Sequence, residues 1–151
     1  MGRIVVGVDG SDDAQQALVW AISEARLRKD GVTALFAWTY PAAVGPFEAI
    51  VPASLNVDFG KEGDEIVQRA IKEATAGATD VEVNGEVVEM PPAQALLRAS
   101  EGADLVVIGS RGLGGFRGLL LGSVGHQVAQ HAQCPVVIIP HGERVAASGQ
   151  A

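Results

Sequence analysis

A glycine-rich segment without acidic residues is the part of this chain best suited to chemistry with an anion. Residues 105–142 contain no Asp or Glu, although the chain of 151 residues has a formal net charge of −7. Within this stretch an apolar run leads into Gly-Ser-Arg-Gly-Leu-Gly-Gly-Phe-Arg-Gly at 109–118, and Gly122-Ser123 follows. Glycine lets the backbone approach a ligand closely, and free N–H groups at a helix N-terminus bind anions. Since no nearby carboxylate in the sequence repels a negative ligand, the segment predicts a phosphate-binding loop.

Several other kinds of site are disfavoured. The lysines of this chain, Lys29, Lys61 and Lys72, do not follow a glycine loop, so a Walker A sequence is excluded, and the turn after the first apolar run lacks the Gly-x-Gly-x-x-Gly fingerprint. His126 and His131 are close enough in sequence to suggest metal ligands, but no third Cys, His or carboxylate lies near them. No Ser-His-Asp order or pair of carboxylates emerges either. We therefore expect neither a metal site nor catalytic residues.

Composition limits the class of protein. The length fits one domain, and 48% hydrophobic residues favour an ordinary folded core. The pI near 4.8 argues against binding to nucleic acid or to an anionic membrane. A single cysteine, Cys134, excludes an internal disulfide, and no apolar run reaches the about 18 residues of a membrane span. We expect a cytoplasmic protein.

Apolar runs and helix-period segments alternate along the chain, which predicts an α/β domain with an open, parallel five-stranded sheet covered by helices on both faces. Strands are expected at 3–9, 32–39, 81–89, 105–109 and 136–140, and helices after Ser11 to about Asp30 and at 58–76, 92–100 and 123–132. Residues 40–57 contain three prolines and are expected to form a long loop. Residues 1–141 should form the domain, with a flexible tail at 142–151.

The site is expected where the first and fourth strands end. Ligands of such sheets bind beyond the carboxyl ends of the strands, at the point where the strand order reverses. Asp9-Gly10-Ser11 follows the first strand, and the glycine loop follows the fourth. If these two strands are neighbours, both loops face one crevice.

Three blocks of sequence together resemble the universal stress protein family over roughly residues 3–140. They are Val-Gly-Val-Asp-Gly-Ser at 6–11, the pattern Gly109-x2-Gly112-x9-Gly122-Ser123, and Ala-Gln-Cys-Pro-Val-Val-Ile at 132–138. The resemblance implies a Rossmann-like fold with strand order 3-2-1-4-5 and a dimer. In the branch of the family that the Gly-x2-Gly-x9-Gly-Ser/Thr pattern marks, it also implies bound ATP.

The same resemblance implies roles for individual residues. Asp9 matches the acid expected near the ribose and adenine, and Ala37 matches the position whose backbone meets the adenine. Relatives often read Gly-x-Pro-Ala ahead of the third helix, whereas this chain has Met at 90, which is expected to narrow the rim of the crevice. The candidate cofactor-binding residues are Gly7, Val8, Asp9, Ala37, Ile108, Gly109, Arg111, Gly112, Gly115, Gly122, Ser123 and Val124.

The favoured function is a nucleotide-dependent homodimeric sensor of the stress response, which holds its ligand without turning it over quickly. The ligand is expected to be ATP, with or without Mg²⁺, and ADP and cyclic AMP are alternatives. Pairing through the apolar strand Val136–Pro140 would form the homodimer. Two other functions stay open: a slow ATPase, and an interaction module whose nucleotide site has lost its function.

Overall fold

The computed structural model describes residues 1–39, 58–112 and 121–142, in which strands and helices alternate. The elements are β1 (Arg3–Gly7), α1 (Asp12–Arg28), β2 (Gly31–Trp38), α2 (Phe59–Thr75), β3 (Val83–Glu89), α3 (Pro92–Ser100), β4 (Leu105–Gly109), α4 (Ser123–His131) and β5 (Val136–Ile139). Each lies within two residues of its predicted bounds. The predicted loop at 40–57, Gly115 and nearly all of the predicted tail lie outside the described residues.

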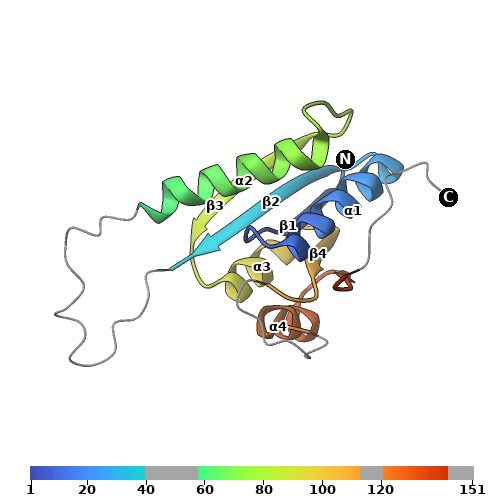
Figure 1. Cartoon of the computed structure of the whole chain (residues 1–151). Coiled ribbons are helices and arrows are strands. Elements are labelled where there is room, and N and C mark those ends of the chain that lie inside the picture. The colour runs from blue at the N-terminus through green and yellow to red at the C-terminus, as the bar shows by residue number, and fades with distance from the viewer. Residues whose placement is uncertain (40–57, 113–120, 143–151) are drawn as a thin grey trace, which may run out of the picture.

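The five strands form one parallel sheet in the order β3-β2-β1-β4-β5, which confirms the predicted fold class and strand order (Figure 1). From β1 the chain adds β2 and then β3 on one side of β1. It then crosses back to the other side of β1, where it adds β4 and then β5. In the centre of the sheet Val6 lies between Ala34 of β2 and Val107 of β4. The strand order therefore reverses between β1 and β4, and their neighbouring carboxyl ends satisfy the condition for a crevice.

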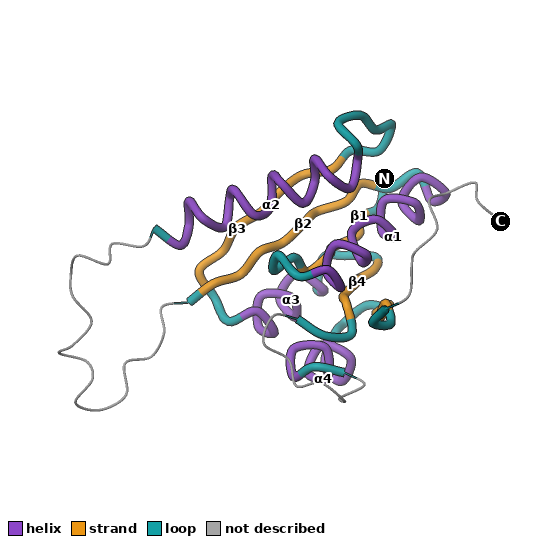
Figure 2. Tube along the Cα trace, viewed as in Figure 1, coloured by secondary structure: helices purple, strands orange, loops and turns teal. Residues whose placement is uncertain are grey.

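Helices cover both faces of the sheet, as the alternating strand residues show. Ile4 and Val6 pack into one buried cluster with residues of α1 and α2, whereas Val5 packs into the other with residues of α3 and α4. Figure 2 shows the strands as the middle layer between these helices. Because the central strands are buried on both faces, their sequences read as continuous apolar runs.

Local sequence sets where α1 begins and ends. The Ser11 hydroxyl accepts a hydrogen bond from the Ala14 N–H at 3.2 Å, so Ser11 is the N-cap that the sequence predicts. The helix ends at Lys29, which adopts a left-handed conformation with φ 61° and whose N–H bonds back to the Ala25 carbonyl. The start of α1 is therefore fixed directly beside the end of β1, at the predicted crevice.

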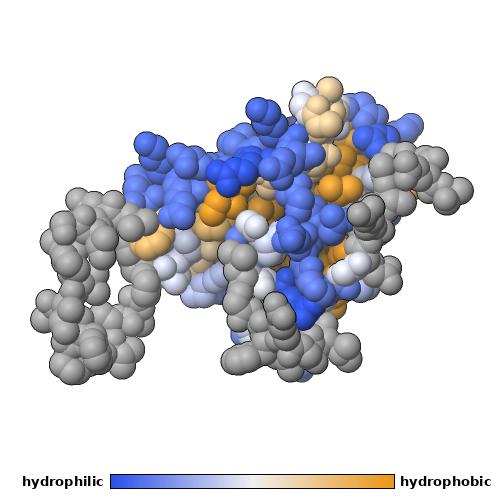
Figure 3. All heavy atoms as spheres, in the orientation of Figure 1, coloured by the Kyte–Doolittle hydropathy of each residue, from blue (hydrophilic) through white to orange (hydrophobic). Residues whose placement is uncertain are grey.

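The surface is mainly hydrophilic over the outer side of α2, with hydrophobic residues emerging beneath it (Figure 3). Among the residues that the structure describes, no helix combines the length and apolar character needed to cross a bilayer.

Cys134 lies before β5 and is partly exposed, and burial raises the pKa of its thiol. A raised pKa leaves less thiolate at neutral pH, which suits a structural cysteine better than a reactive one.

Candidate functional site

A cavity of about 560 Å³ opens at the carboxyl ends of β1, β2 and β4, and α3 and the start of α4 also contribute to its wall. Its volume is in the range of small-molecule and cofactor sites. The lining residues are Gly7, Val8, Asp9, Ser11, Ala14, Leu35, Ala37, Pro92, Leu96, Ile108, Gly109, Ser110, Arg111, Gly112, Gly122, Ser123, Val124 and Gly125.

The structure brings together the residues predicted for the site. Every one of the predicted cofactor-binding residues lines this cavity except Gly115, which lies outside the described residues. The wall also contains residues that were not predicted, mostly neighbours of predicted ones or apolar residues of β2 and α3: Ser11, Ala14, Leu35, Pro92, Leu96, Ser110 and Gly125. The α3 residues could have been found from their helical spacing, since Pro92 and Leu96 are four residues apart.

Met90 is not among the described residues that line the cavity. Its side chain packs against the buried cluster under α3 and α4, and its N–H donates to the Trp38 carbonyl at 2.9 Å. Trp38 is likewise not among the described lining residues. Its ring packs against that of Phe59, with 5.7 Å between the centroids.

The cavity has an apolar part and a polar part. The apolar part is formed by side chains of the strand ends and of α3, namely Val8, Leu35, Ala37, Pro92, Leu96 and Ile108. The polar part is formed by the turn after β1, the segment after β4 and the start of α4. A wall of this kind suits a ligand with one flat, largely apolar end and one charged end.

The two ends of the glycine loop are tied together at the polar end. The Gly122 N–H donates to the Ser110 carbonyl at 2.7 Å, which places the first turn of α4 beside the end of β4. Gly122 is the N-cap of α4, and no side chain among the described residues caps this helix. The first helical hydrogen bond runs from His126 N–H to the Gly122 carbonyl at 2.9 Å. The three N–H groups before His126 therefore have no partner within the helix and form a potential anion site.

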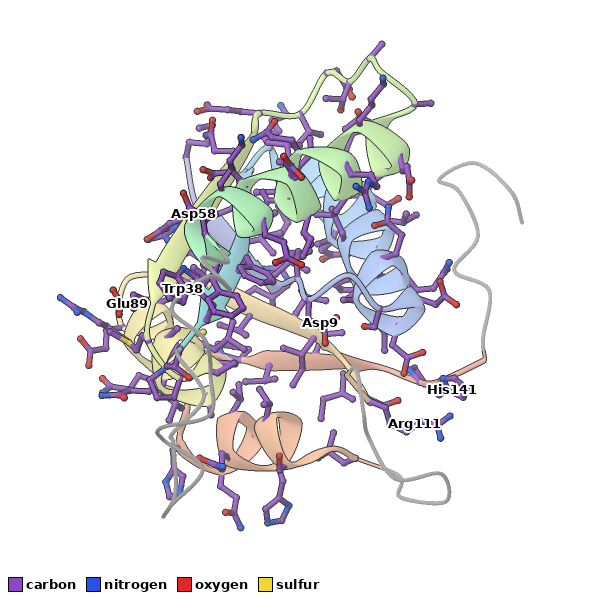
Figure 4. All side chains as sticks on the ribbon, turned by 60° about the vertical axis from the view of Figure 1, so that its left-hand side comes forward. Asp9, Trp38, Asp58, Glu89, Arg111 and His141 are labelled. Carbon is purple, nitrogen blue, oxygen red and sulfur yellow. The ribbon has the colours of Figure 1, made fainter. Side chains whose placement is uncertain are left out.

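The Asp9 side chain stabilises the turn before α1 and also lines the cavity. Its Oδ1 accepts hydrogen bonds from the N–H (2.9 Å) and the hydroxyl (2.5 Å) of Ser11, which fixes the turn before α1. Its Oδ2 lies against Gly112, where an added Cβ would be only 2.6 Å away. Figure 4 shows Asp9, Arg111 and His141 at the same end of the sheet, where β1, β4 and β5 end. The Asp9 carboxylate is thus oriented by Ser11 and also lines the cavity.

Asp13 is a further acidic residue next to the site, and it was not predicted from the sequence. Its carboxylate is buried behind the cavity wall and accepts a hydrogen bond from the Arg111 N–H at 3.2 Å. The glycine loop is therefore free of acids along the chain, but its first residues contact an acid in space. Helical spacing could have indicated its burial, because Asp13 lies four residues before the buried Ala17 and therefore on the same face of α1.

The lack of a side chain at Gly109 allows α1 to pack closely against the end of β4. A Cβ at this position would lie 2.7 Å from the Asp13 Cβ and 2.8 Å from its carbonyl carbon. The absence of a side chain therefore lets the first turn of α1 approach the end of β4. Gly109 also lines the cavity, so the same position contributes to helix packing and to the cavity wall.

The Gly109→Ala substitution should consequently destabilise the fold. Overpacking against the α1 backbone is expected to cost about 1–3 kcal/mol of unfolding free energy, measured by urea denaturation. Gly102→Ala is the matched control, since an added Cβ there meets no described atom within 4 Å. Equal midpoints for the two variants would show that α1 does not make this close approach.

No cluster of three or more His, Cys, Asp or Glu side chains that could hold a metal ion occurs in the described parts of the chain. His126 and His131 are both exposed on α4. In the cavity wall the described carboxylate is that of Asp9, and hydroxyls are offered by Ser11, Ser110 and Ser123.

Comparison with known proteins identifies the family of this chain and agrees with its fold. Residues 1–140 match the Universal stress protein family. Universal stress protein Rv2623 of Mycobacterium tuberculosis (strain ATCC 25618 / H37Rv) is 36% identical over 139 residues, which cover 89% of this chain and 44% of the relative. The chain thus spans less than half the length of that relative.

Two solved structures are also similar. A universal stress protein in complex with cAMP is 31% identical with a TM-score of 0.63, covering 91% of this chain and 95% of that chain. The universal stress protein from Archaeoglobus fulgidus in complex with dAMP is 25% identical with a TM-score of 0.62, covering 92% of this chain and 98% of that chain. With this fold, this loop and a family match over nearly its whole length, the chain belongs to the universal stress protein family.

Proposed function

We propose that the cavity binds an adenine nucleotide, with ATP as the preferred ligand, and that the protein acts as a nucleotide-dependent sensor module of the stress response. The observation that carries the proposal is the tie between Gly122 and Ser110, which brings the uncapped start of α4 to the polar end of an otherwise apolar cavity. The relatives solved with cAMP and with dAMP support an adenine nucleotide as the class of ligand.

In the proposed complex the base lies on the apolar wall and the phosphates lie at the loop. Leu35 and Ala37 of β2 and Ile108 of β4 offer the apolar surface that a flat ring needs. Asp9, oriented by Ser11, can accept a hydrogen bond from the ribose or the adenine. The N–H groups at the start of α4 and the Ser123 hydroxyl then face the phosphates.

We propose that any Mg²⁺ at this site would be bound mainly by the ATP phosphates and by water, with few ligands from the protein. It prefers oxygen ligands and usually keeps several waters, so a single carboxylate with phosphate oxygens is sufficient for binding. Ser123, at the start of α4 where the phosphates are proposed to lie, is the lining residue whose hydroxyl would serve such an ion. Asp9 could do so only in place of its proposed contact with the ribose or adenine. When bound, the ion would neutralise phosphate charge.

Turnover of ATP should be slow. Hydrolysis needs a positioned water and a group that orients it, and Asp9 is the described carboxylate of the cavity wall, already engaged by Ser11. We expect phosphate release no faster than about one event per minute, against about 10 s⁻¹ for a median enzyme. A steady-state rate of several per second that Asp9→Asn abolishes would instead establish an ATPase.

The ligand itself can be identified from the protein as purified. Mass spectrometry of the small molecules released on denaturation should show an adenine nucleotide, with ATP more abundant than ADP or cyclic AMP. Release of a ligand of another class in stoichiometric amount would reject the proposal. The Gly122→Val variant, purified in the same way, is the control: nucleotide released from it in equal amount would be adventitious.

We further propose that two copies pair through β5 to form a homodimer. β5 is the last strand at one edge of the sheet, and Val136, Val137 and Ile138 are all only partly buried. An apolar edge strand invites pairing with another chain, and a two-fold partner satisfies it through identical contacts. Pro135 and Pro140 flank the strand and would confine the pairing to it.

A further inference from the structure

We infer, on the basis of the proposed function, that Asp13 is the positioning residue of the phosphate loop: its buried carboxylate holds the Ser110–Arg111 segment, and His141 holds the carboxylate. Asp13 comes from the first turn of α1, Ser110 and Arg111 follow β4, and His141 follows β5. Three segments far apart in the chain therefore meet at one carboxylate.

Each oxygen of Asp13 has a defined partner. Oδ2 accepts from the Arg111 N–H at 3.2 Å and lies 3.5 Å from the Ser110 hydroxyl. Oδ1 lies 2.6 Å from His141 Nδ1. The His141 ring donates a hydrogen bond to Oδ1 whenever Nδ1 carries a hydrogen. The Asp13 side chain is only 8% exposed, whereas that of His141 is 55% exposed. A carboxylate this deeply buried needs such partners, because an unpaired buried charge is costly.

The contacts hold Ser110 from three sides. Its N–H donates to the Ile139 carbonyl of β5 at 2.9 Å, its carbonyl accepts from Gly122 N–H at 2.7 Å, and its hydroxyl faces Asp13. The tie to Gly122 is the same bond that sets the start of α4 at the cavity. Loss of the Asp13 contacts would therefore loosen Ser110, and with it the hydrogen bond that places Gly122 and the start of α4 at the polar end of the cavity.

The same hydrogen bonds determine where the backbone N–H of Arg111 points. The Arg111 N–H points to Asp13 in the core of the domain, so it is not directed at the phosphates. Phosphate binding then depends on the other N–H groups, above all those at the start of α4. The negative charge of Asp13 lies behind the wall, and a protonated His141 next to it would reduce its repulsion of the ligand.

The first test needs no ligand. Amide hydrogen exchange of the full chain, followed by NMR, should show that Asp13→Ala lowers the protection of the Arg111 amide at least about tenfold relative to that of Val107 in β4. Asp13→Asn keeps an acceptor oxygen and should stay within about threefold of the natural protein. Asp12→Ala is the matched control, since it removes an exposed acid from the same helix turn. Unchanged protection at Arg111 in Asp13→Ala would overturn the inference.

The second test separates positioning from general stability. By calorimetry, Asp13→Ala should weaken ATP binding at least about tenfold, and adenosine binding should change less than about twofold. His141→Ala should weaken ATP binding by a smaller factor, and His141→Asn, whose amide can reach the place of Nδ1, should restore it. Equal losses for ATP and adenosine would contradict a role at the phosphate loop. If the natural protein bound neither compound, the proposed function would fail, and the exchange experiment alone would decide the role of Asp13.

Discussion

Replacing Gly122 by Val is expected to abolish ATP binding and to leave the fold intact. Gly122 has φ −72° and ψ 169°, an extended conformation that any residue adopts, so the backbone is not strained by a side chain. A Cβ at this position would lie 3.6 Å from the Ser110 carbonyl oxygen and 4.0 Å from Gly112 N, in ordinary contact with the inner side of the loop. The two methyl groups beyond it would occupy the path of the phosphates.

The expected loss is large because phosphate contacts are charge-assisted. Losing two such hydrogen bonds costs about 3 kcal/mol or more, which corresponds to at least a hundredfold weaker binding, about the limit of detection for a micromolar ligand. Calorimetry with ATP measures this directly. Gly102→Val, far from the cavity lining, is the control and should bind as the natural protein does. Undiminished affinity in Gly122→Val with an unchanged circular dichroism spectrum would remove the loop from the site.

Replacing Ile138 by Pro should convert the proposed dimer to monomer. The carbonyls of Pro135 and Ile139 accept hydrogen bonds from the β4 residue Val106 and from Ser110. Since strand residues alternate in direction, residue 137 also faces β4, whereas Ile138 directs its N–H toward the open edge. Proline at 138 therefore removes a donor from the edge and leaves the pairing with β4 in place.

Light scattering at micromolar concentration gives the readout. The natural protein should have about twice the chain mass of 15.6 kDa, and Ile138→Pro should have the mass of one chain. Val137→Pro is the matched control, since it deletes an N–H that bonds to β4 and should lower the unfolding free energy of each subunit instead. A monomer for the natural protein would exclude pairing through β5. It would leave the proposed nucleotide site untouched, because we propose that site within one subunit.

The elements of this fold could be predicted from local signals. Ser11 caps α1 through its own hydroxyl, and the apolar runs of β1 and β4 correspond to strands that are buried on both faces. Their order in the sheet could not be worked out from such signals. It was inferred from the resemblance of three sequence blocks to a known family, and the structure confirms it.

The candidate site was predictable where it depends on spacing and not where it depends on tertiary contact. Gly109, Gly112 and Gly122 stand out by their intervals in the chain, and all three line the cavity. Asp13 does not stand out, because its partners Arg111 and His141 are 98 and 128 residues away. The packing of α1 on β4 and the pairing of β4 with β5 bring them together.

The central claim is that an adenine nucleotide occupies the cavity between the ends of β1 and β4. The most direct test is a titration of the ¹⁵N-labelled protein with ATP, followed through the backbone amide signals. The largest shifts should fall on Asp9, Ala37, Gly112, Ser123 and Val124, with little change in α2 and in the loop before β3. Saturating ATP that leaves these five amides unmoved, or moves amides elsewhere instead, would contradict the account.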